Sequence, residues 1–317
     1  MRREPDVNHN PSTAGEPTQG ALSALADALA PGARRGVPLA RFTAMRVGGP
    51  AALLVLVESL DQLADAVEMA REHGLPWRVL GGGCNVLVAD RGLEGLVIVN
   101  RADAVSVEGQ TVRAASGVRM PLLVRRTVDA CLAGLTWAAG LPGTVGGAVV
   151  GNAGAFDGDM AGSLQSAAVL EANGEIVERP NAWFDFAYRT SRLKREGERE
   201  RVVLEATFQL EPGDEEVLRN RADEVVAWRR AHHPSHATMG STFKNPPDGY
   251  AGELIEEAGL KGYRIGGAQV SEQHANFLVN TGDAAAGDVL ALIRHIQAEV
   301  ERQFGVQLAL EIELLGW

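Results

Sequence analysis

The spacing of apolar residues predicts helices in both halves of the chain. Between residues 59 and 73 the apolar side chains recur every three or four positions, which places them on one face of a helix. Ser59 and Gln62 form a capping box at the start of this segment, and Gly74 ends it. The same spacing predicts further helices at residues 119–133, 215–231, 251–258 and 285–304.

Alternating or continuous apolar runs predict strands between these helices. Residues 105–114 alternate on both sides of a central turn, which predicts a hairpin. Residues 77–80 form a short apolar strand that runs directly into three glycines. Further strands are predicted at residues 95–100, 167–171, 201–210 and 306–315.

Breaks in the pattern divide the chain into a tail and two domains. Residues 1–40 are interpreted as a disordered tail and a lead-in, because the first twenty are polar and lack the apolar stretch of a signal peptide. Pro212-Gly213 separates residues 41–212 from residues 213–317. We therefore expect an α+β protein with a larger N-terminal domain and a smaller C-terminal α/β domain.

Composition and charge exclude several classes of partner. A net charge of −11 argues against nucleic acid or an anionic membrane, although a local cluster could still hold an anionic substrate. Cys84 and Cys131 are the only cysteines, so we expect neither a disulfide framework nor a metal site. No apolar run reaches the roughly 18 residues of a membrane-spanning helix. These features predict a soluble, cytoplasmic protein. We expect a monomer, although no feature of the sequence decides the oligomeric state.

Glycine is frequent, at 37 of 317 residues, and it clusters where a cofactor could lie. Gly81-Gly82-Gly83-Cys84-Asn85 follows a predicted strand, and successive glycines let backbone N–H groups converge on an anion. It is not a dinucleotide-binding fingerprint, because Val86 interrupts the spacing and no helix follows. Residues 139–155 are also rich in glycine, and their apolar positions fit neither the period of a helix nor that of a strand. A tight turn or close strand packing would explain either segment alone, but together with residues 46–50 they favour a cofactor-binding surface.

A polar segment in the second domain contains candidate functional residues, but its pattern does not identify one reaction. Residues 240–246 contain Ser241, Lys244 and Asn245, which could hold a phosphate or donate a proton. The order of residues matches neither a P-loop nor the nucleophile elbow of a serine hydrolase. An ordinary polar loop is an equally good interpretation.

Two other candidate segments have ordinary explanations when taken alone. Tyr188 and Arg189 form a pair of a kind that usually lies on the surface. In residues 306–315, alternation places the apolar side chains on one face and Glu311 and Glu313 on the opposite, solvent-facing side.

Taken in order, these segments resemble the UDP-N-acetylenolpyruvoylglucosamine reductase family. The resemblance spans residues 40–317, and the combination of segments is highly specific. It is similar to the shorter of the family's two types, because residues 240–280 run without an inserted element. The matching segments are RVGGPA at 46–51, LGGGCNVLV at 80–88, AGLPGTVGGAVVGNAGAFD at 139–157, YRTS at 188–191, GSTFKNP at 240–246, AGLKGYRIGGAQVSEQHANFLVN at 258–280, and the strand with Glu311.

The resemblance implies a flavoenzyme of peptidoglycan synthesis that uses FAD and NADPH. The first domain would have the FAD-binding fold of the vanillyl-alcohol-oxidase type, and the second would bind a UDP-sugar. NADPH would reduce the flavin, whose N5 would pass hydride to C3 of the enolpyruvyl group. The pyrophosphate would lie at residues 81–85 and the isoalloxazine near residues 140–155. The implied cofactor-binding residues are Arg46, Gly48, Gly81, Gly82, Gly83, Cys84, Asn85, Gly140, Pro142, Gly143, Gly146, Gly147, Asn152, Gly154 and Ala155.

The resemblance also assigns catalytic and substrate-binding residues. Arg189 corresponds to the family's carboxylate-binding arginine, Ser241 to its proton donor, and Glu311 to the glutamate that polarises the same carboxylate. Glu313 has no counterpart and is expected to be solvent-facing or structural. The implied substrate-binding residues are Tyr188, Arg189, Lys244 and Asn245.

The sequence departs from the family pattern at two places, and two other classes of protein compete with this interpretation. Cys84 stands where serine is common, which changes little if the backbone binds the ligand. Residues 232–239 are shorter than the family's approach to Ser241, which leaves the positioning of that loop open. The competing classes are an oxidase of the same flavin fold, acting on an alcohol or sugar, and a non-catalytic flavin or nucleotide-sugar binding protein.

Overall fold

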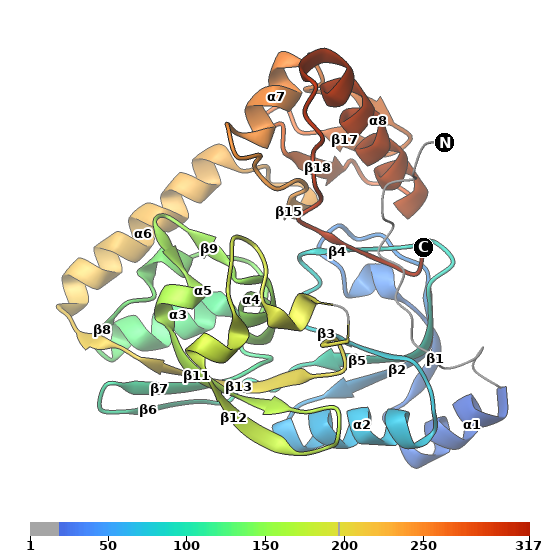
Figure 1. Ribbon diagram of the computed structural model, residues 1–317, viewed down its shortest axis with the longest axis vertical. Coiled ribbons are helices and arrows are strands. Elements are labelled where there is room, and N and C mark those ends of the chain that lie inside the picture. The colour runs from blue at the N-terminus through green and yellow to red at the C-terminus, as the bar shows by residue number, and fades with distance from the viewer. Residues whose placement is uncertain (1–18, 196) are drawn as a thin grey trace.

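The computed structural model describes residues 19–195 and 197–317, which form a larger and a smaller body (Figure 1). The larger body contains a four-stranded and a five-stranded sheet as well as short two-stranded pairs, and it carries a long helix along one side. The smaller body contains one sheet and two helices. Residues 1–18, expected to be a disordered tail, lie outside the described residues.

The first sheet of the larger body is built around three parallel strands. Its order is β1-β2-β5-β3, with β1 antiparallel at the edge. Helix α2 (Leu60–Glu72) is the predicted helix, and Ser59 Oγ accepts a hydrogen bond from the Gln62 N–H at 3.2 Å. The expected lead-in contributes helix α1 (Gln19–Ala28) and the edge strand. The strands are β1 (Arg34–Pro38), β2 (Pro50–Val57), β3 (Trp77–Leu80) and β5 (Leu93–Asn100).

The second sheet of the larger body is antiparallel, in the order β12-β11-β13-β7-β6. The predicted hairpin is confirmed as the pair β6 and β7. The strands are β6 (Val105–Glu108), β7 (Thr111–Ala115), β11 (Leu164–Leu170), β12 (Ile176–Pro180) and β13 (Val202–Gln209). Smaller elements beside it are α3 (Met120–Asp129), β8 (Leu132–Ala133), β9 (Gly154–Ala155), β10 (Gly158–Asp159), α5 (Met160–Ser163), β14 (Glu211–Pro212) and the 3-10 turns η1 (Leu39–Arg41), η2 (Thr136–Ala138), η3 (Asn181–Phe184) and η4 (Arg192–Lys194).

The glycine-rich segment contains a short helix that the sequence pattern did not predict. Helix α4 (Val145–Gly151) buries Val145, Ala148 and Val149 in the core of the larger body. Its glycines weaken the helical propensity, so tertiary packing and not local preference forms the helix. A Cβ on Gly146 would lie 2.8 Å from the Cβ of Ser116, so this packing requires glycine.

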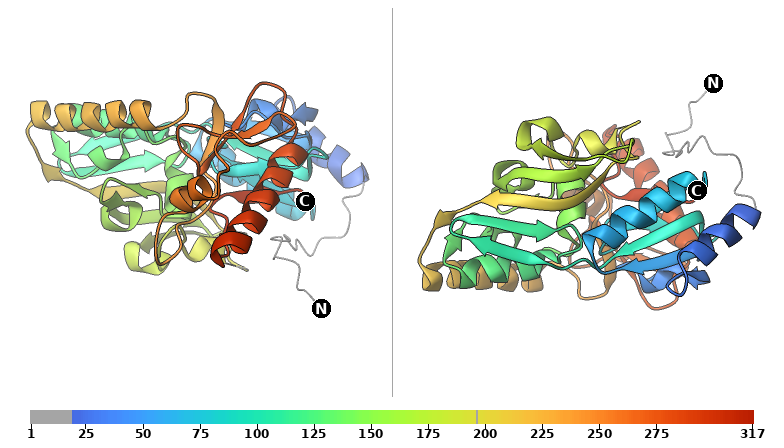
Figure 2. Two further views of the ribbon diagram at one scale, coloured as in Figure 1. Left: turned by 90° about the horizontal axis from the view of Figure 1, so that it is seen from above. Right: turned by 90° about the horizontal axis from the view of Figure 1, so that it is seen from below.

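Helix α6 (Glu215–His232) belongs by its packing to the larger body, although the sequence analysis placed it in the second domain. Its buried Leu218 and Val225 join the apolar core that α3 and the second sheet share. Figure 2 shows α6 running along one side of this body. The change of body therefore falls after His232 and not at residue 213.

The smaller body contains the sheet β15-β18-β17-β16, which is antiparallel throughout. Both predicted helices are present, as α7 (Ala251–Glu257) and α8 (Ala286–Phe304). Residues of the larger body, including Met45 and Leu87, complete its apolar core. The strands are β15 (Ala237–Ser241), β16 (Arg264–Ile265), β17 (Ala268–Val270) and β18 (Phe277–Asn280).

The C-terminal segment returns to the larger body. Strand β19 (Glu313–Leu315) pairs in parallel with β4 (Val86–Val88), which follows the first glycine-rich loop. The strand is much shorter than the predicted run of residues 306–315, because this segment first bridges Phe243 in the smaller body through Leu310. This path places the C-terminal glutamates beside the glycine-rich loop.

Among the residues that the structure describes, no helix is both long enough and apolar enough to cross a membrane.

Candidate active site

A cavity of about 680 Å³ lies between the two bodies. The larger body contributes both glycine-rich segments, residues between 189 and 203, and the end of α6. The smaller body contributes the end of β15 together with His274 and Phe277. The three residues expected to be catalytic, Arg189, Ser241 and Glu311, all line this cavity.

The two glycine-rich segments lie directly against each other at one wall. A Cβ added to Gly82 would lie 2.8 Å from the Cα of Gly143, and one added to Gly81 would lie 2.2 Å from the Oγ1 of Thr144. Side chains at either glycine would therefore separate the segments. Their close approach leaves backbone as the lining of this wall, as the sequence analysis proposed for an anion-binding loop.

Asn85 connects the first glycine-rich loop to the C-terminal segment. Its side-chain Nδ2 donates to the carbonyl of Glu311 at 3.1 Å. Its own carbonyl accepts from the N–H of Glu313 at 2.9 Å. One residue of the loop therefore fixes the backbone of both glutamates.

Arg189 occupies a tight turn that reaches into the cavity. Ala187 and Thr190 close the turn with two backbone hydrogen bonds of 3.1 Å, and Arg189 has a φ of 55°. Asn152, at the end of α4, donates to the carbonyl of Ala187 at 2.9 Å. Ser191 donates to a carbonyl within α4 at 2.7 Å. The turn is therefore anchored to α4 on both sides of the arginine.

The guanidinium of Arg189 pairs with the carboxylate of Glu311. Nε lies 3.0 Å from Oε1, an ion pair in which the N–H has no aligned hydrogen bond. Burial raises the pKa of Glu311, while the charges of Arg189, Lys194 and Lys244 lower it in part. This carboxylate is consequently a desolvated group whose charge depends on its cationic neighbours.

Ser241 is held next to Glu311 by backbone pairing and by Asn276. The carbonyl of Thr242 accepts from the N–H of Glu311 at 2.9 Å. The buried side chain of Asn276 accepts from the N–H of Phe243 at 2.9 Å and donates to its carbonyl at 2.8 Å. These contacts fix the loop whose positioning the sequence left open, and Asn276 is a residue that sequence reasoning missed.

Most residues expected to bind the flavin line the cavity. They are Gly81, Gly82, Gly83, Cys84, Asn85, Pro142, Gly143, Gly146, Gly147, Gly154 and Ala155. The other four lie outside its lining. Gly140 faces α6, Asn152 supports the Arg189 turn, Gly48 packs on Val88, and Arg46 is exposed.

The residues expected to bind substrate, apart from Arg189, lie outside the cavity lining. Tyr188 is 53% exposed, and its ring lies 5.2 Å from the guanidinium carbon of Arg189. Asn245 is exposed and accepts from the N–H of Ala251 at 3.1 Å, which ties the loop to the start of α7. Burial lowers the pKa of Lys244, and the nearby charge of Lys194 lowers it further.

Glu313 and Lys194 are site residues that the sequence analysis did not identify. Both line the cavity, and Nζ of Lys194 lies 3.2 Å from Oε1 of Glu313. Glu313 was expected to be solvent-facing or structural, and the solvent-facing alternative does not hold, because the segment bends before β19 and brings both glutamates to the cavity. The rarity of lysine in this chain was the available signal for Lys194.

An aromatic and cationic wall, formed by Phe156, Trp228, Arg229 and His233, was also missed. Phe156 meets Trp228 edge to face at 5.1 Å, and Arg229 lies over the Phe156 ring at 5.3 Å. Nη2 of Arg229 is buried without a protein partner. Burial, together with the charge of Arg229, lowers the pKa of His233 to about 4, so this imidazole is neutral at pH 7.

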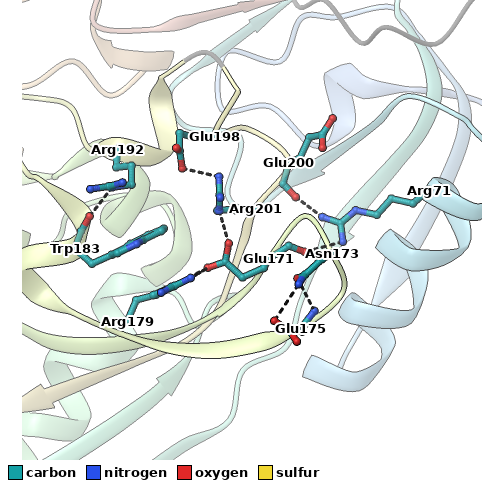
Figure 3. A network of polar contacts seen from close by, with 10 residues as sticks. All are labelled: Arg71, Glu171, Asn173, Glu175, Arg179, Trp183, Arg192, Glu198, Glu200 and Arg201. Atoms are coloured by element: carbon teal, nitrogen blue, oxygen red, sulfur yellow. Dashed lines mark hydrogen bonds and ion pairs between the residues drawn. The ribbon is translucent and has the colours of Figure 1, made fainter.

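A network of charged residues surrounds Arg201, a residue of the cavity lining (Figure 3). The carboxylate of Glu171 accepts from Arg179 at 2.8 Å and also from Arg201, whose other side contacts Glu198. Arg71 on α2 donates to the carbonyl of Glu171 at 2.9 Å. Since Arg201 lines the cavity, this network fixes one of its cationic side chains.

The lining has the composition that a flavin dinucleotide requires. Cationic side chains outnumber carboxylates, which suits a ligand with a pyrophosphate. The wall at Gly82 and Gly143 is formed by backbone, and the cavity of about 680 Å³ can hold a large ligand, so the residues present fit FAD. The charged lining residues are Arg78, Arg189, Lys194, Arg199, Arg201, Arg229, Glu311 and Glu313. Within the described ranges, no group of three His, Cys, Asp or Glu residues could hold a metal ion.

Comparisons with known proteins agree with this composition. Residues 51–179 match the FAD binding domain family, and residues 232–315 match the C-terminal domain of UDP-N-acetylenolpyruvoylglucosamine reductase. The chain is 42% identical over 281 residues to the UDP-N-acetylenolpyruvoylglucosamine reductase of Halalkalibacterium halodurans, covering 88% of this chain and 92% of that protein. The chain belongs to the UDP-N-acetylenolpyruvoylglucosamine reductase family.

Further relatives agree with the assignment. Reductase 2 of Symbiobacterium thermophilum is 42% identical over 286 residues, which is 89% of this chain and 92% of that protein. The crystal structure of UDP-N-acetylenolpyruvylglucosamine reductase from Thermus caldophilus has a TM-score of 0.78 and 36% identity, covering 89% of this chain and 99% of that one.

Membership confirms several predictions from the sequence. The fold class is confirmed, with an FAD-binding domain of the vanillyl-alcohol-oxidase type and the family's own C-terminal domain. The chain is a flavin-dependent oxidoreductase of peptidoglycan-precursor synthesis. The high coverage of these relatives also fits the shorter type of the family.

Proposed function

We propose that this chain reduces the enolpyruvyl group of UDP-N-acetylglucosamine enolpyruvate to UDP-N-acetylmuramate, with NADPH as the reductant. In this proposal Ser241 donates the proton, and Arg189 and Glu311 act on the substrate carboxylate. The observation that carries the proposal is the convergence of these three residues on the cavity that the glycine-rich segments line. An ordinary flavin-binding protein would need no such convergence.

The positions of Arg189 and Glu311 suit a reaction that develops negative charge. When bound, the flavin supplies hydride to C3 of the enolpyruvyl group. The charge then developing at C2 spreads into the adjacent carboxylate, where a fixed guanidinium stabilises it. Arg189 is fixed by the anchored turn and by its 3.0 Å ion pair with Glu311.

Ser241 is positioned to donate a proton at short range. A serine hydroxyl is a weak acid, so it can protonate only a strongly basic centre held close to it. The backbone bond between Thr242 and Glu311 at 2.9 Å keeps the hydroxyl and the carboxylate-binding pair on neighbouring segments. This arrangement supports proton delivery to C2 while hydride arrives at C3.

The same arrangement supports proposals for the oligomeric state, the location of the reaction and the role of Lys244. All three proposed catalytic residues come from one chain, so we propose that a monomer is competent. The charged nucleotide-sugar and NADPH suit a cytoplasmic reaction. Lys244, adjacent to the Ser241 loop, is proposed to meet the diphosphate of the UDP-sugar.

Substituting Ser241 should separate the two half-reactions. In Ser241→Ala, NADPH should bleach the flavin at a near-normal rate, whereas reoxidation by the enolpyruvyl sugar should slow by about 10²–10⁴-fold, the usual contribution of a general acid. Stopped-flow absorbance measures both rates. Ser235→Ala, at an exposed position of the preceding loop, is the control and should leave both unchanged.

Three outcomes would contradict the proposal. Equal loss of both half-reactions in Ser241→Ala would mean that Ser241 is structural. Rapid flavin reduction by an alcohol or sugar, with none by NADPH, would favour an oxidase. A flavin-loaded wild-type protein that never oxidises NADPH in the presence of the enolpyruvyl sugar would be a binding protein.

A further inference from the structure

Two ion pairs, and not one, connect the same two segments across the cavity. Arg189 meets Glu311 at 3.0 Å, and Lys194 meets Glu313 at 3.2 Å. The side chains of Lys194 and Glu313 are 16% and 28% exposed, so both are largely withdrawn from water. The second pair lies in the lining of the same cavity as the first.

Local structure fixes both partners of the second pair. Lys194 ends η4, which begins at Arg192 and follows the anchored turn of Arg189. Glu313 begins β19, and its N–H donates to the carbonyl of Asn85 at 2.9 Å. The pair is therefore held between two supported backbone segments, unlike a flexible surface contact.

The second pair changes the charge around Glu311. Arg189, Lys194 and Lys244 supply three cations that act on this buried carboxylate. With Glu313 included, the cluster has one more cation than carboxylates. A substrate carboxylate would bring the cluster to neutrality, which is the condition under which buried charges are tolerated.

We propose that Lys194 is a positioning residue of the active site. Held in place by η4, its charge favours the ionised form of the Glu311 carboxylate beside Arg189 and leaves the cluster with room for one further anion. Lys194 therefore acts through Glu311 and is not required to touch the reacting atoms. This inference rests on the proposed function only for its effect on turnover.

The direction of the effect can be worked out from the neighbours of Glu311. Burial raises the pKa of this carboxyl, and the nearby cations oppose that rise. Removing the charge of Lys194 should therefore raise the pKa of Glu311 further. Removing the negative charge of Glu313 should move it in the opposite direction.

Carboxyl carbon NMR of protein labelled at glutamate Cδ tests the inference without turnover. The Glu311 resonance is assigned by its loss in Glu311→Gln. In Lys194→Met its titration midpoint should rise, whereas Lys194→Arg should restore the wild-type midpoint. Lys261→Met is the matched control, because Lys261 forms a comparable ion pair with Glu256 at 2.7 Å on the surface.

Glu313→Gln supplies a second variant with the opposite sign. Its Glu311 midpoint should fall, and opposite shifts in the two variants cannot come from a general loosening of the fold. The pH profile of flavin reoxidation by the enolpyruvyl sugar should shift in parallel with each midpoint. The inference is overturned if Lys194→Met leaves the midpoint unchanged or if both variants move it the same way. If the Glu311 midpoints shift as expected but the enolpyruvyl sugar does not reoxidise the flavin of the wild-type protein, the proposed function is rejected and the inference about Lys194 is not.

Discussion

Arg189 has a backbone conformation that residues other than glycine rarely adopt, with a φ of 55°. Such conformations cost about 1–3 kcal/mol and persist only where the surroundings impose them. Here Asn152 and Ser191 anchor the turn to α4 on either side. The strain is therefore tied to an observed contact, the 3.0 Å approach of the guanidinium to Glu311.

Glu171 is the most buried carboxylate of the network in Figure 3, with a side chain only 8% exposed. Burial alone would raise its pKa, but hydrogen bonds and charges from Arg201 and Arg179 outweigh burial and lower it. A carboxyl whose pKa is lowered by folding stabilises the folded state above its unfolded pKa, about 4.3. That contribution is lost as the pH falls through the lower, folded value.

Glu171→Gln should consequently destabilise the protein most at neutral pH. The variant keeps the shape but leaves the half-buried guanidinium of Arg179 without its carboxylate and Arg201 with Glu198 alone, so we expect a loss of about 1–3 kcal/mol at pH 7. The difference from wild type should shrink as the pH falls below about 4. Urea unfolding at several pH values measures both quantities.

Glu175→Gln is the control for this prediction. Glu175 lies in the same network but is exposed and accepts only from Asn173 at 2.9 Å. Its loss should change the free energy of unfolding by about 0.5 kcal/mol or less. A pH-independent effect of Glu171→Gln would show that the side chain contributes by packing alone.

At the scale of elements, the turn between β3 and β4 requires a glycine at one position, which the sequence alone does not identify. Gly83 has a φ of +61°, and a Cβ there would lie 2.0 Å from the carbonyl of Phe42. Gly109, in the hairpin turn between β6 and β7, has the same φ of +61° with no atom within 4 Å of a Cβ. A side chain at either position would strain the backbone, but only a side chain at Gly83 would also clash with a neighbouring segment.

Gly83→Ala should abolish flavin binding, whereas Gly109→Ala should not. Both substitutions incur the left-handed conformational cost of roughly 1–2 kcal/mol. Only Gly83→Ala must also displace the backbone of Phe42 or the glycine-rich loop that lines the cavity. Flavin absorbance per chain and urea unfolding measure the two effects, and equal flavin content in both variants would contradict the assignment of this loop.

Local pattern accounts for the elements that sequence reasoning predicted correctly. The capped α2 and the hairpin of β6 and β7 repeat apolar residues at the period of their structure. Helix α4 has no such signal, because one of its glycines, Gly146, is required by tertiary packing against Ser116. Glu313 was misplaced because its direction depends on a bend that Asn85, 228 positions earlier in the chain, imposes from the glycine-rich loop.

The site residues divide in the same way. Ser241 and Arg189 have counterparts with known roles in the family that the sequence resembles. Lys194 lies outside the matching segments, and Asn276, although inside one of them, matters through a partner remote in sequence. Asn276 holds the Ser241 loop through Phe243, and Lys194 meets Glu313 across the cavity. No local period encodes contacts of this kind, so the three-dimensional structure was needed to find them.

Across the whole molecule, charge is distributed unevenly. The chain has a net charge of −11, yet cationic side chains predominate in the cavity lining. Backbone N–H groups at the glycine-rich loops were expected to hold phosphates without help from side chains. The structure adds Arg78, Arg199 and Arg201 at the lining, so a local positive field accompanies the backbone wall.

The two bodies are joined by contacts that cross between them. Strand β19 pairs with β4, and Asn280 of the smaller body donates to the carbonyl of Met45 at 3.0 Å. Helix α8 follows Ala285, whose side chain has no oxygen to cap the helix. Asp90 of the larger body accepts from the first N–H groups of α8, Ala286 at 2.9 Å and Gly287 at 2.8 Å.

Asp90→Ala should therefore weaken the junction as well as the helix. Losing a cap and its favourable charge at a helix N-terminus costs about 1–2 kcal/mol. Because the partner belongs to the other body, hydrogen exchange should rise at residues 86–88 and 313–315 as well as in the first turn of α8. Asp61→Ala, in the first turn of α2 within one body, is the control and should leave the junction amides unchanged. Faster exchange confined to α8 would mean that Asp90 caps the helix without coupling the two bodies.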